Sequence, residues 1–237
     1  MKYLHDIGEY FLMLKKVFGR MTKTSVLRGL IFKEIDDLII SSLGIVIFIS
    51  FFIGGVVTIQ TALNLNNPLI PKSLIAFTAR QSIILEFSPT FISIIMAGKV
   101  GSNITSSIGT MRVMEQIDAL EVMGINSANY LIFPKIIAML FYPFVIAISM
   151  FVGIAGAYAA GVLGGFVAGE QFLNGLQNDF ISFHLVYAFI KTFFFAIILA
   201  TIPAYHGYYM KGGALEVGKA STTAFVWTSV VLILANY

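Results

Sequence analysis

The chain has 237 residues, of which 58% are hydrophobic and only 11% are charged. In soluble domains about a quarter of all residues are charged, so this composition excludes an ordinary soluble protein and indicates an integral membrane protein. The absence of cysteine excludes disulfides and thiolate metal sites. The net charge of +3 does not indicate binding to nucleic acid, because the basic residues gather near the N-terminus, where they would face lipid headgroups.

The first segment, residues 5–33, is predicted to be an amphipathic helix that lies in the membrane interface. Its apolar residues recur at helical spacing, and its charged residues fill the other faces. The apolar set is Ile7, Tyr10, Phe11, Leu14 and Phe18, and the charged set is Asp6, Glu9, Lys15 and Lys16. An ordinary packing helix of a soluble region is the alternative interpretation.

Five apolar runs after this segment predict transmembrane helices at about 38–63, 74–97, 134–168, 185–209 and 220–237. Each has about the length that crosses a bilayer. The run 134–168 exceeds one membrane thickness and is expected to tilt, kink or project. A loop with two prolines is predicted at 64–72. The expected fold is an all-α integral membrane protein, with one interfacial helix and about five transmembrane helices in a single membrane domain over 1–237.

Twelve of the fifteen Lys and Arg residues lie in the N-terminal segment, the connection 98–135 and the turn 210–219. Positive charge concentrates in cytoplasmic loops. The N-terminus is therefore predicted to be cytoplasmic, and the C-terminus, after five spans, to lie on the outer side.

The connection 98–133 contains a short segment, EQIDALEVMG, with two unlike sides. Acidic and amide groups occupy one side, and Ile117, Leu120 and Met123 form an apolar side. Such a helix is suited to docking on a partner subunit, and a plain solvated helix is the alternative. The candidate coupling residues are Glu115, Gln116, Ile117, Asp118, Leu120 and Glu121.

Small residues in the third predicted span recur at intervals of three and four, which favours close helix packing over a ligand site. The stripe includes Gly153, Gly156, Gly161 and Gly164. The three histidines show no metal-ligand spacing, and neither a phosphate-binding loop nor a hydrolase motif occurs. We expect no catalytic residue, no metal and no cofactor in this chain.

Several motifs, in order along the chain, resemble the MlaE (YrbE) family of ABC transporter permeases. They are Glu86 and Pro89 in LEFSPTF, AGKVGS at 97–102, Glu115-Gln116, Pro134-Lys135 and GALEVGKASTT at 213–223. The chain departs from the family in Asn126-Ser127, where the family has Asp-Pro, and in Ser107, where an acidic residue is common.

The resemblance implies the membrane subunit of a system that moves phospholipid between the inner and outer membranes of a Gram-negative-type bacterium. The chain would form a homodimer in the inner membrane, with its C-terminus in the periplasm. ATP and Mg would be bound by separate ATPase subunits like MlaF, on which the segment 98–133 would dock. An MCE-domain protein like MlaD would bind on the outer side, and a small STAS-type protein is a further expected partner.

Polar groups within the predicted spans are candidates for the lipid path, because ionisable groups are costly in hydrocarbon and are functional candidates by default. The set is Gln60, Asn64, Arg80, Glu86 and Lys191. A structural ion pair of Glu86 with Arg80 or Lys191, or a carboxylate at headgroup level, is the alternative. Two other functions stay open: an intramembrane lipid-modifying enzyme that uses Glu86, and an ABC permease for another hydrophobic or small solute.

Overall fold

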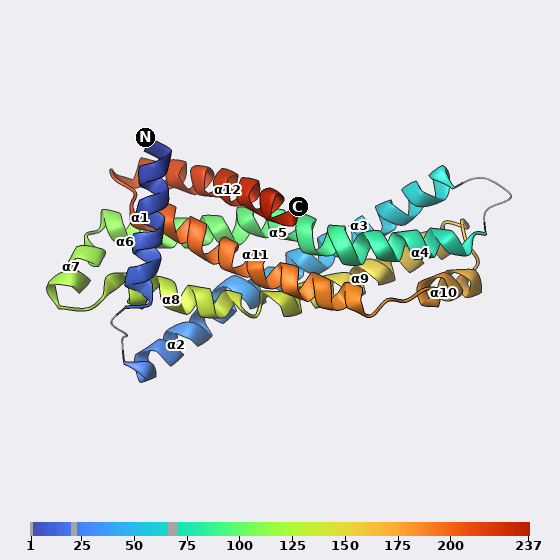
Figure 1. Cartoon of the computed structure of the whole chain (residues 1–237), viewed down its shortest axis with the longest axis horizontal. Helices are drawn as coiled ribbons and strands as arrows, with labels where there is room; N and C mark the ends of the chain where they lie inside the picture. The colour runs from blue at the N-terminus through green and yellow to red at the C-terminus, as the bar shows by residue number, and fades with distance from the viewer. Residues whose placement is uncertain (1, 20–22, 66–70) are drawn as a thin grey trace. The chain divides into compact units, whose positions relative to one another are not determined.

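The computed structural model describes residues 2–19, 23–65 and 71–237. The α-helices are α1 (Lys2–Val17), α2 (Thr24–Glu34), α3 (Leu43–Asn64), α4 (Ser73–Ser82), α5 (Ile92–Met96), α6 (Ser102–Val113), α7 (Gln116–Val122), α8 (Ser127–Met139), α9 (Tyr142–Leu163), α10 (Gly169–Gln177), α11 (Phe183–Tyr208) and α12 (Ala214–Asn236) (Figure 1). These residues contain no strand, which confirms the all-α prediction. Most of the predicted loop 64–72 lies outside the described residues.

Five helical segments among the described residues are long and apolar enough to cross a membrane, as predicted. They are Thr24–Asn64, Ser73–Val113, Ser127–Leu163, Phe183–Tyr208 and Ala214–Asn236. The first two span 41 residues each, because short π-helical and 3-10 stretches join neighbouring α-helices without ending them. One π-helix, Ile83–Phe91, contains Pro89. Because proline has no backbone N–H to donate, a change of hydrogen-bond register there is expected.

The boundaries differ from the sequence prediction in two places. The segment 5–33 is not one helix: α1 ends at Val17, and α2 begins at Thr24 and runs into the first span. The connection 98–133 is mostly helical, since α6 prolongs the second span to Val113 and α8 already begins at Ser127. In both places the end of an apolar run predicts the end of a membrane helix, but a helix can continue through polar residues past the apolar layer because its backbone bonds are internal.

The contacts group the chain into two compact units. Unit one contains Met1–Ser42, Ile94–Tyr142 and Phe193–Tyr237, and unit two contains Leu43–Ser93 and Pro143–Thr192. In four of the five candidate spans the border between the units falls inside the helical segment. The sequence pattern does not indicate this division, and the single domain over 1–237 stays a prediction.

Unit one packs α6 along α12, and α1 and α2 against α8. A Cβ atom added at Gly207 of α11 would lie 2.8 Å from the carbonyl oxygen of Thr105, so only glycine allows α6 and α11 to approach this closely. The hydroxyl of Thr105 donates to the carbonyl of Pro203 at 2.9 Å. A buried ion pair joins Lys135 of α8 to Glu34 of α2, with 2.6 Å between Nζ and Oε1.

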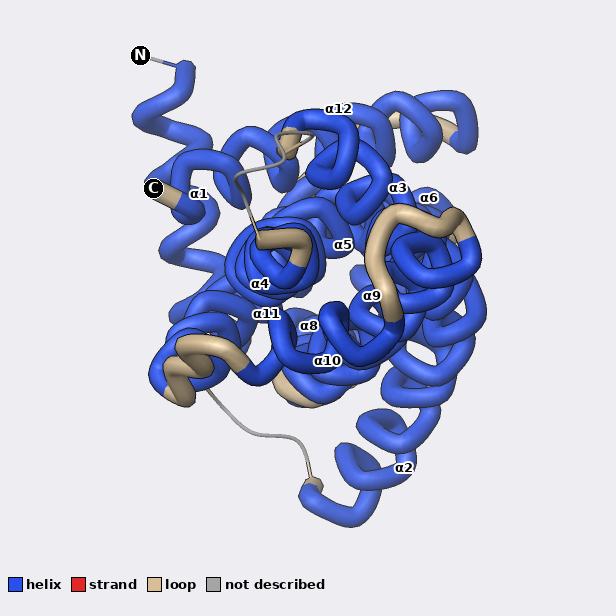
Figure 2. The backbone as a smooth tube through the Cα atoms, turned by 90° about the vertical axis from the view of Figure 1, so that its right-hand side faces the viewer, coloured by secondary structure: helices blue, strands red, loops and turns tan. Residues whose placement is uncertain are grey.

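Unit two packs α4 beside α10 (Figure 2) and brings α3 against α9. An added Cβ at Gly153 would lie 3.5 Å from the carbonyl oxygen of Ser50, one at Gly54 only 1.9 Å from that of Gly153, and one at Gly156 2.0 Å from that of Phe51. These glycines, which lack side chains, let the backbones of α3 and α9 come into contact. Gly153 and Gly156 of the stripe thus lie where the two helices cross.

The last two glycines of the stripe have different surroundings. An added Cβ at Gly161 would lie 3.2 Å from side-chain atoms of Phe172 and Thr58, so this residue also packs between elements. Gly164 does not: it lies beyond the end of α9, and its nearest neighbours are the carbonyl of Ala160 and the ring of Phe166. The spacing of small residues continues past the end of the helix, so it does not by itself place Gly164 at a contact between helices.

We predict that Gly156→Leu lowers the stability of the folded protein by at least the roughly 1–3 kcal/mol that overpacking costs, since its first side-chain atom would collide with backbone. The melting temperature of the purified chain in detergent measures this loss. Ala155→Leu, one residue away on the exposed side of α9, is the matched control and is expected to melt like the unaltered chain. Equal melting of both variants would contradict the packing assignment.

Candidate functional site

The short helix α7 connects α6 to α8 between the second and third spans (Figure 1). Glu115, just before it, adopts a left-handed conformation with φ 58°. At its other end Gly124 has φ 73°, and two backbone hydrogen bonds close the last turn. The N–H of Gly124 donates to the backbone carbonyl of Glu121 at 2.9 Å, and the N–H of Ile125 donates to that of Leu120 at 3.0 Å. This is the Schellman arrangement that satisfies the last carbonyls of a helix. Sharp turns at both ends therefore fix α7 as a separate helix.

Polar contacts tie α7 to the helices on either side of it. The guanidinium of Arg112 in α6 lies 2.8 Å from the carboxylate of Asp118, an exposed pair worth less than about 1 kcal/mol. Oε1 of Glu121 lies 2.9 Å from the hydroxyl of Ser127 and 3.1 Å from that of Tyr208, and the two hydroxyls are 2.8 Å apart. Ser127 begins α8 and Tyr208 ends α11. One carboxylate thus joins α7 to the ends of two candidate spans.

Of the apolar side that the sequence predicts for α7, only Met123 is exposed. Ile117 is fully buried and Leu120 is half-buried, because the turns at both ends fold α7 back onto unit one. The exposed apolar side chains are Met114 (63%), Val122 (89%) and Met123 (65%). Of the predicted docking residues, Ile117 positions the helix and Glu121 connects it. The remaining exposed surface, here named the α7 surface, comprises Met114, Glu115, Gln116, Asp118, Val122 and Met123.

Helix α1 is held at the start of α8 by two side-chain amides. Asn126 donates to the carbonyl of Lys16 at 2.8 Å, and Asn129 donates to that of Val17 at 2.7 Å. Further along α1, the hydroxyl of Tyr10 lies 2.7 Å from that of Thr201, and burial raises the pKa of Tyr10. In sequence, Asn126-Ser127 is only a departure from the family motif, but in the structure Asn126 bonds to α1 and Ser127 to Glu121.

Glu86 and Lys191 form an ion pair within unit two. The ammonium of Lys191 lies 3.2 and 3.3 Å from the two carboxylate oxygens and 3.1 Å from the carbonyl of Leu85. Thr90 donates to the same carboxylate at 3.1 Å. The side chain of Lys191 is only 5% exposed, but that of Glu86 is 51% exposed. The pair therefore has a buried cation and a carboxylate that still reaches the surface.

Arg80 is not a partner of Glu86. It is buried, and its guanidinium donates to the carbonyls of Leu176, of Asn178 at 3.0 Å and of Asp179 at 3.3 Å. These carbonyls lie at the C-terminal end of α10, where a cation is favourable. Arg80 therefore closes the end of α10. Gln60 and Asn64 are exposed near the end of α3. The lipid-path roles of all three stay predictions.

The expectation of no metal or cofactor in this chain stays a prediction. Among the described residues, His5, Asp6 and Glu9 place one potential ligand atom each within 4.8 Å of one another. The side chain of His5 is 72% exposed, and the carboxylate of Glu9 accepts a hydrogen bond from Tyr205 at 3.2 Å. This group lies on α1 and touches none of the candidate residues above.

We predict that Glu121→Ala destabilises the folded protein by about 1–2 kcal/mol, because it removes the charged acceptor of two hydroxyls. Amide hydrogen exchange is expected to accelerate in α7 and in the first turn of α8. Asp118→Ala, which breaks only an exposed pair, is the control and is expected to change stability by less than about 1 kcal/mol. Similar effects of both substitutions on exchange in α8 would argue against the connecting role of Glu121.

Comparison with known proteins gives consistent matches. Residues 31–237 match the family described as Permease MlaE. A probable ABC transporter permease protein of Rickettsia bellii is 32% identical over 227 residues, which cover 93% of this chain and 87% of the relative. A probable ABC transporter permease protein of Synechocystis is 29% identical over 236 residues, which cover 96% of this chain and 86% of the relative. The protein TRIGALACTOSYLDIACYLGLYCEROL 1, chloroplastic, of Arabidopsis thaliana is 33% identical, with 83% of this chain and 56% of the relative covered.

Proposed function

This chain belongs to the MlaE family of ABC transporter permeases, and on that premise we propose that it is the membrane subunit through which separate ATPase subunits drive the movement of phospholipid. The observation that carries the proposal is the α7 surface together with the bonds of Glu121. A helix that is exposed on one side and joined to two spans on the other is suited to receiving force from a partner.

Docking on the α7 surface would use apolar contact and charge together. Met114, Val122 and Met123 offer flexible and branched apolar side chains. Glu115 adds negative charge beside them, while Asp118 is paired with Arg112. A partner groove with apolar walls and a basic group opposite Glu115 would complement this surface. A displacement of α7 would then act on α8 and α11 through Glu121, and on α6 through the turn at Glu115.

A diacylglycerol lipid as the substrate is supported by two observations. The Arabidopsis relative carries the name of a galactosylated diacylglycerol, which shares the acyl chains of a phospholipid but has no phosphate. In this chain, the half-exposed carboxylate of Glu86 is fixed by Lys191 and Thr90 in a π-helical stretch, a local structure that is frequent at functional sites. We assign Glu86 to contact with the polar headgroup of the lipid, with Gln60 and Asn64 as further polar contacts, and Lys191 to holding Glu86 in place.

The assembly that belongs to this proposal is a homodimer in an inner membrane with a cytoplasmic N-terminus. ATP and Mg bind to ATPase subunits like MlaF, an MCE-domain protein like MlaD binds on the outer side, and a small STAS-type protein completes the complex. The positive-inside distribution of Lys and Arg supports the orientation. A lipid-modifying enzyme is less favoured, because Glu86 is engaged by a cation and a hydroxyl rather than by a nucleophile or a metal ligand set.

We predict that Val122→Asp with Met123→Asp reduces co-purification of the ATPase at least about tenfold, a loss of about 1.4 kcal/mol or more in binding, because charge replaces exposed apolar contact. The matched control is Leu173→Asp with Ile181→Asp, which alters two exposed apolar residues in the stretch between α9 and α11. That control should retain the ATPase. Unchanged co-purification with the α7 double variant would contradict the docking surface.

We predict that Glu86→Gln lowers both stability and the lipid bound per folded protein, because it leaves a buried ammonium without its charged partner. The double variant Glu86→Gln with Lys191→Met separates these effects. Replacing a buried pair with neutral residues often restores stability, so its melting temperature should recover, while bound lipid measured by mass spectrometry stays at least about threefold low. Recovery of lipid together with stability would assign Glu86 to structure alone.

A further inference from the structure

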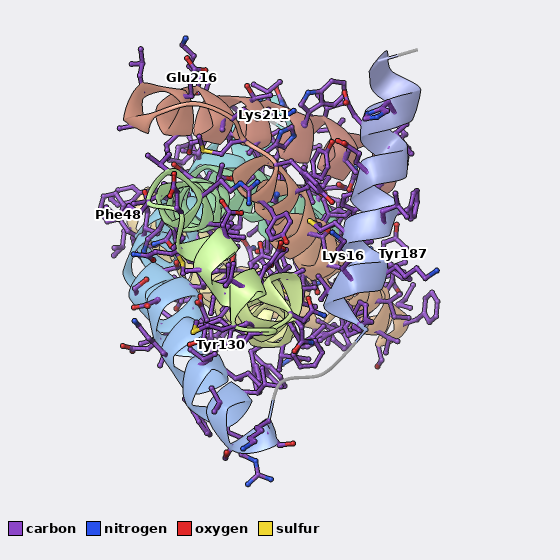
Figure 3. All side chains as sticks on the ribbon, turned by 90° about the vertical axis from the view of Figure 1, so that its left-hand side faces the viewer. Lys16, Phe48, Tyr130, Tyr187, Lys211 and Glu216 are labelled. Atoms are coloured by element: carbon purple, nitrogen blue, oxygen red, sulfur yellow. The ribbon has the colours of Figure 1, made fainter. Side chains whose placement is uncertain are left out.

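A groove of about 510 Å³ in unit one has no role in the proposed transport step. It is lined by Glu9, Leu12, Lys15, Lys16, Gly19, Asn126 and Tyr209. Its volume lies within the range of small-molecule sites, which is roughly 300–1,000 Å³. Figure 3 labels Lys16, one of these lining residues, on α1.

The charges of the groove favour an anion. Lys15 and Lys16 are exposed, and within residues 2–19, 23–65 and 71–237 neither forms an ion pair. The one carboxylate in the lining, that of Glu9, accepts a hydrogen bond from Tyr205 and lies 3.8 Å from His5. The lining therefore contains two ammonium groups without an ion-pair partner and one carboxylate that already has partners, so positive charge prevails in the groove.

The end of α1 is also prepared for a negative ligand. The last carbonyls of a helix carry partial negative charge and would repel an anion. Here the side-chain amides of Asn126 and Asn129 cap those of Lys16 and Val17. Burial and the nearby carboxylates of Glu9 and Glu121 raise the pKa of Tyr209, so its phenol stays protonated and keeps a hydrogen to donate.

The helix that carries the groove also exposes apolar side chains. Leu12, in the lining, is 60% exposed, and Ile7, Phe11 and Phe18, elsewhere on α1, are between 54% and 63% exposed. A helix with exposed apolar side chains and lysines is suited to lie in a membrane interface. A ligand that has a phosphate beside acyl chains matches this combination, whereas a soluble phosphate would leave the apolar side chains uncovered.

We propose that this groove binds the phosphate headgroup of an anionic phospholipid from the leaflet on which α1 lies. The site is separate in role from the path assigned to Glu86. Its lining residue Asn126 directly precedes Ser127, which contacts Glu121, so an occupied groove would steady the base of α8 next to the coupling helix. If the N-terminus is cytoplasmic, as proposed above, this is the cytoplasmic leaflet; the binding of the headgroup itself does not depend on that orientation.

The test uses the full chain in phosphatidylcholine vesicles that contain a minor fraction of labelled phosphatidylglycerol, with a photoreactive benzophenone side chain at position 12. Lys15→Gln with Lys16→Gln is expected to reduce labelling about tenfold, because both ammonium groups are lost. The matched control, Lys23→Gln with Lys33→Gln, removes the same charge from exposed positions around α2 and should change labelling less than about twofold. Tyr209→Phe, which keeps the ring, should reduce labelling as well.

Equal losses in the two lysine variants would overturn the proposal, because they would indicate attraction by surface charge in general. Removal of the label by added inorganic phosphate would assign the groove to a soluble anion, and removal by added ATPase subunits would assign it to a protein partner. Absence of labelling in the parent protein would also overturn it. No ATPase is needed for labelling, so failure of the α7 docking test leaves this test intact.

Discussion

Every backbone N–H and C=O group in hydrocarbon needs a partner inside the chain, and this constraint governs the structure of the protein. It makes the spans helical, and it makes helix ends the places where polar side chains are used. Arg80 satisfies the carbonyls at the end of α10, and Asn126 and Asn129 satisfy those at the end of α1. These three polar side chains are thus engaged in closing helix ends.

Helix packing follows from a second constraint. Apolar side chains gain little by leaving lipid for one another, so helices associate where their backbones approach closely. The crossing of α3 and α9 in unit two uses Gly54, Gly153 and Gly156 for this purpose, with the hydroxyls of Ser50 and Ser149 paired at 2.8 Å. Unit one uses Gly207 against α6 in the same way. Within unit one, this close contact packs α11 against α6, the helix that directly precedes α7.

The proposed coupling and the proposed lipid groove meet in one short stretch of chain. Asn126 lines the groove and caps α8, while Ser127 contacts the carboxylate of Glu121. A ligand beside α1 and a partner on α7 would therefore both act on the first turn of α8. This arrangement offers a physical route by which the lipid composition of a leaflet could influence a step driven by ATP.

The sequence by itself determined the class of the protein and the position of its elements. Length and apolar content require five membrane helices, small-residue spacing indicates the crossing at Gly153 and Gly156, and the motifs from Glu86 to Thr223 indicate the family. It could not determine helix ends within polar stretches, because charged residues are tolerated in a helix that projects from the bilayer. This is why the first helical segment begins at Thr24, the second continues to Val113 and the third begins at Ser127, all beyond their predicted bounds.

Only the tertiary structure decided which polar groups meet. Arg80 and Lys191 both qualified by sequence as partners of Glu86, and only the packing of unit two pairs Lys191 with it and turns Arg80 toward α10. Likewise, periodicity gives α7 an apolar side at Ile117 but does not say which side faces inward. The left-handed residue Glu115 and the turn at Gly124 set that direction, because they fix how the helix returns to its neighbours.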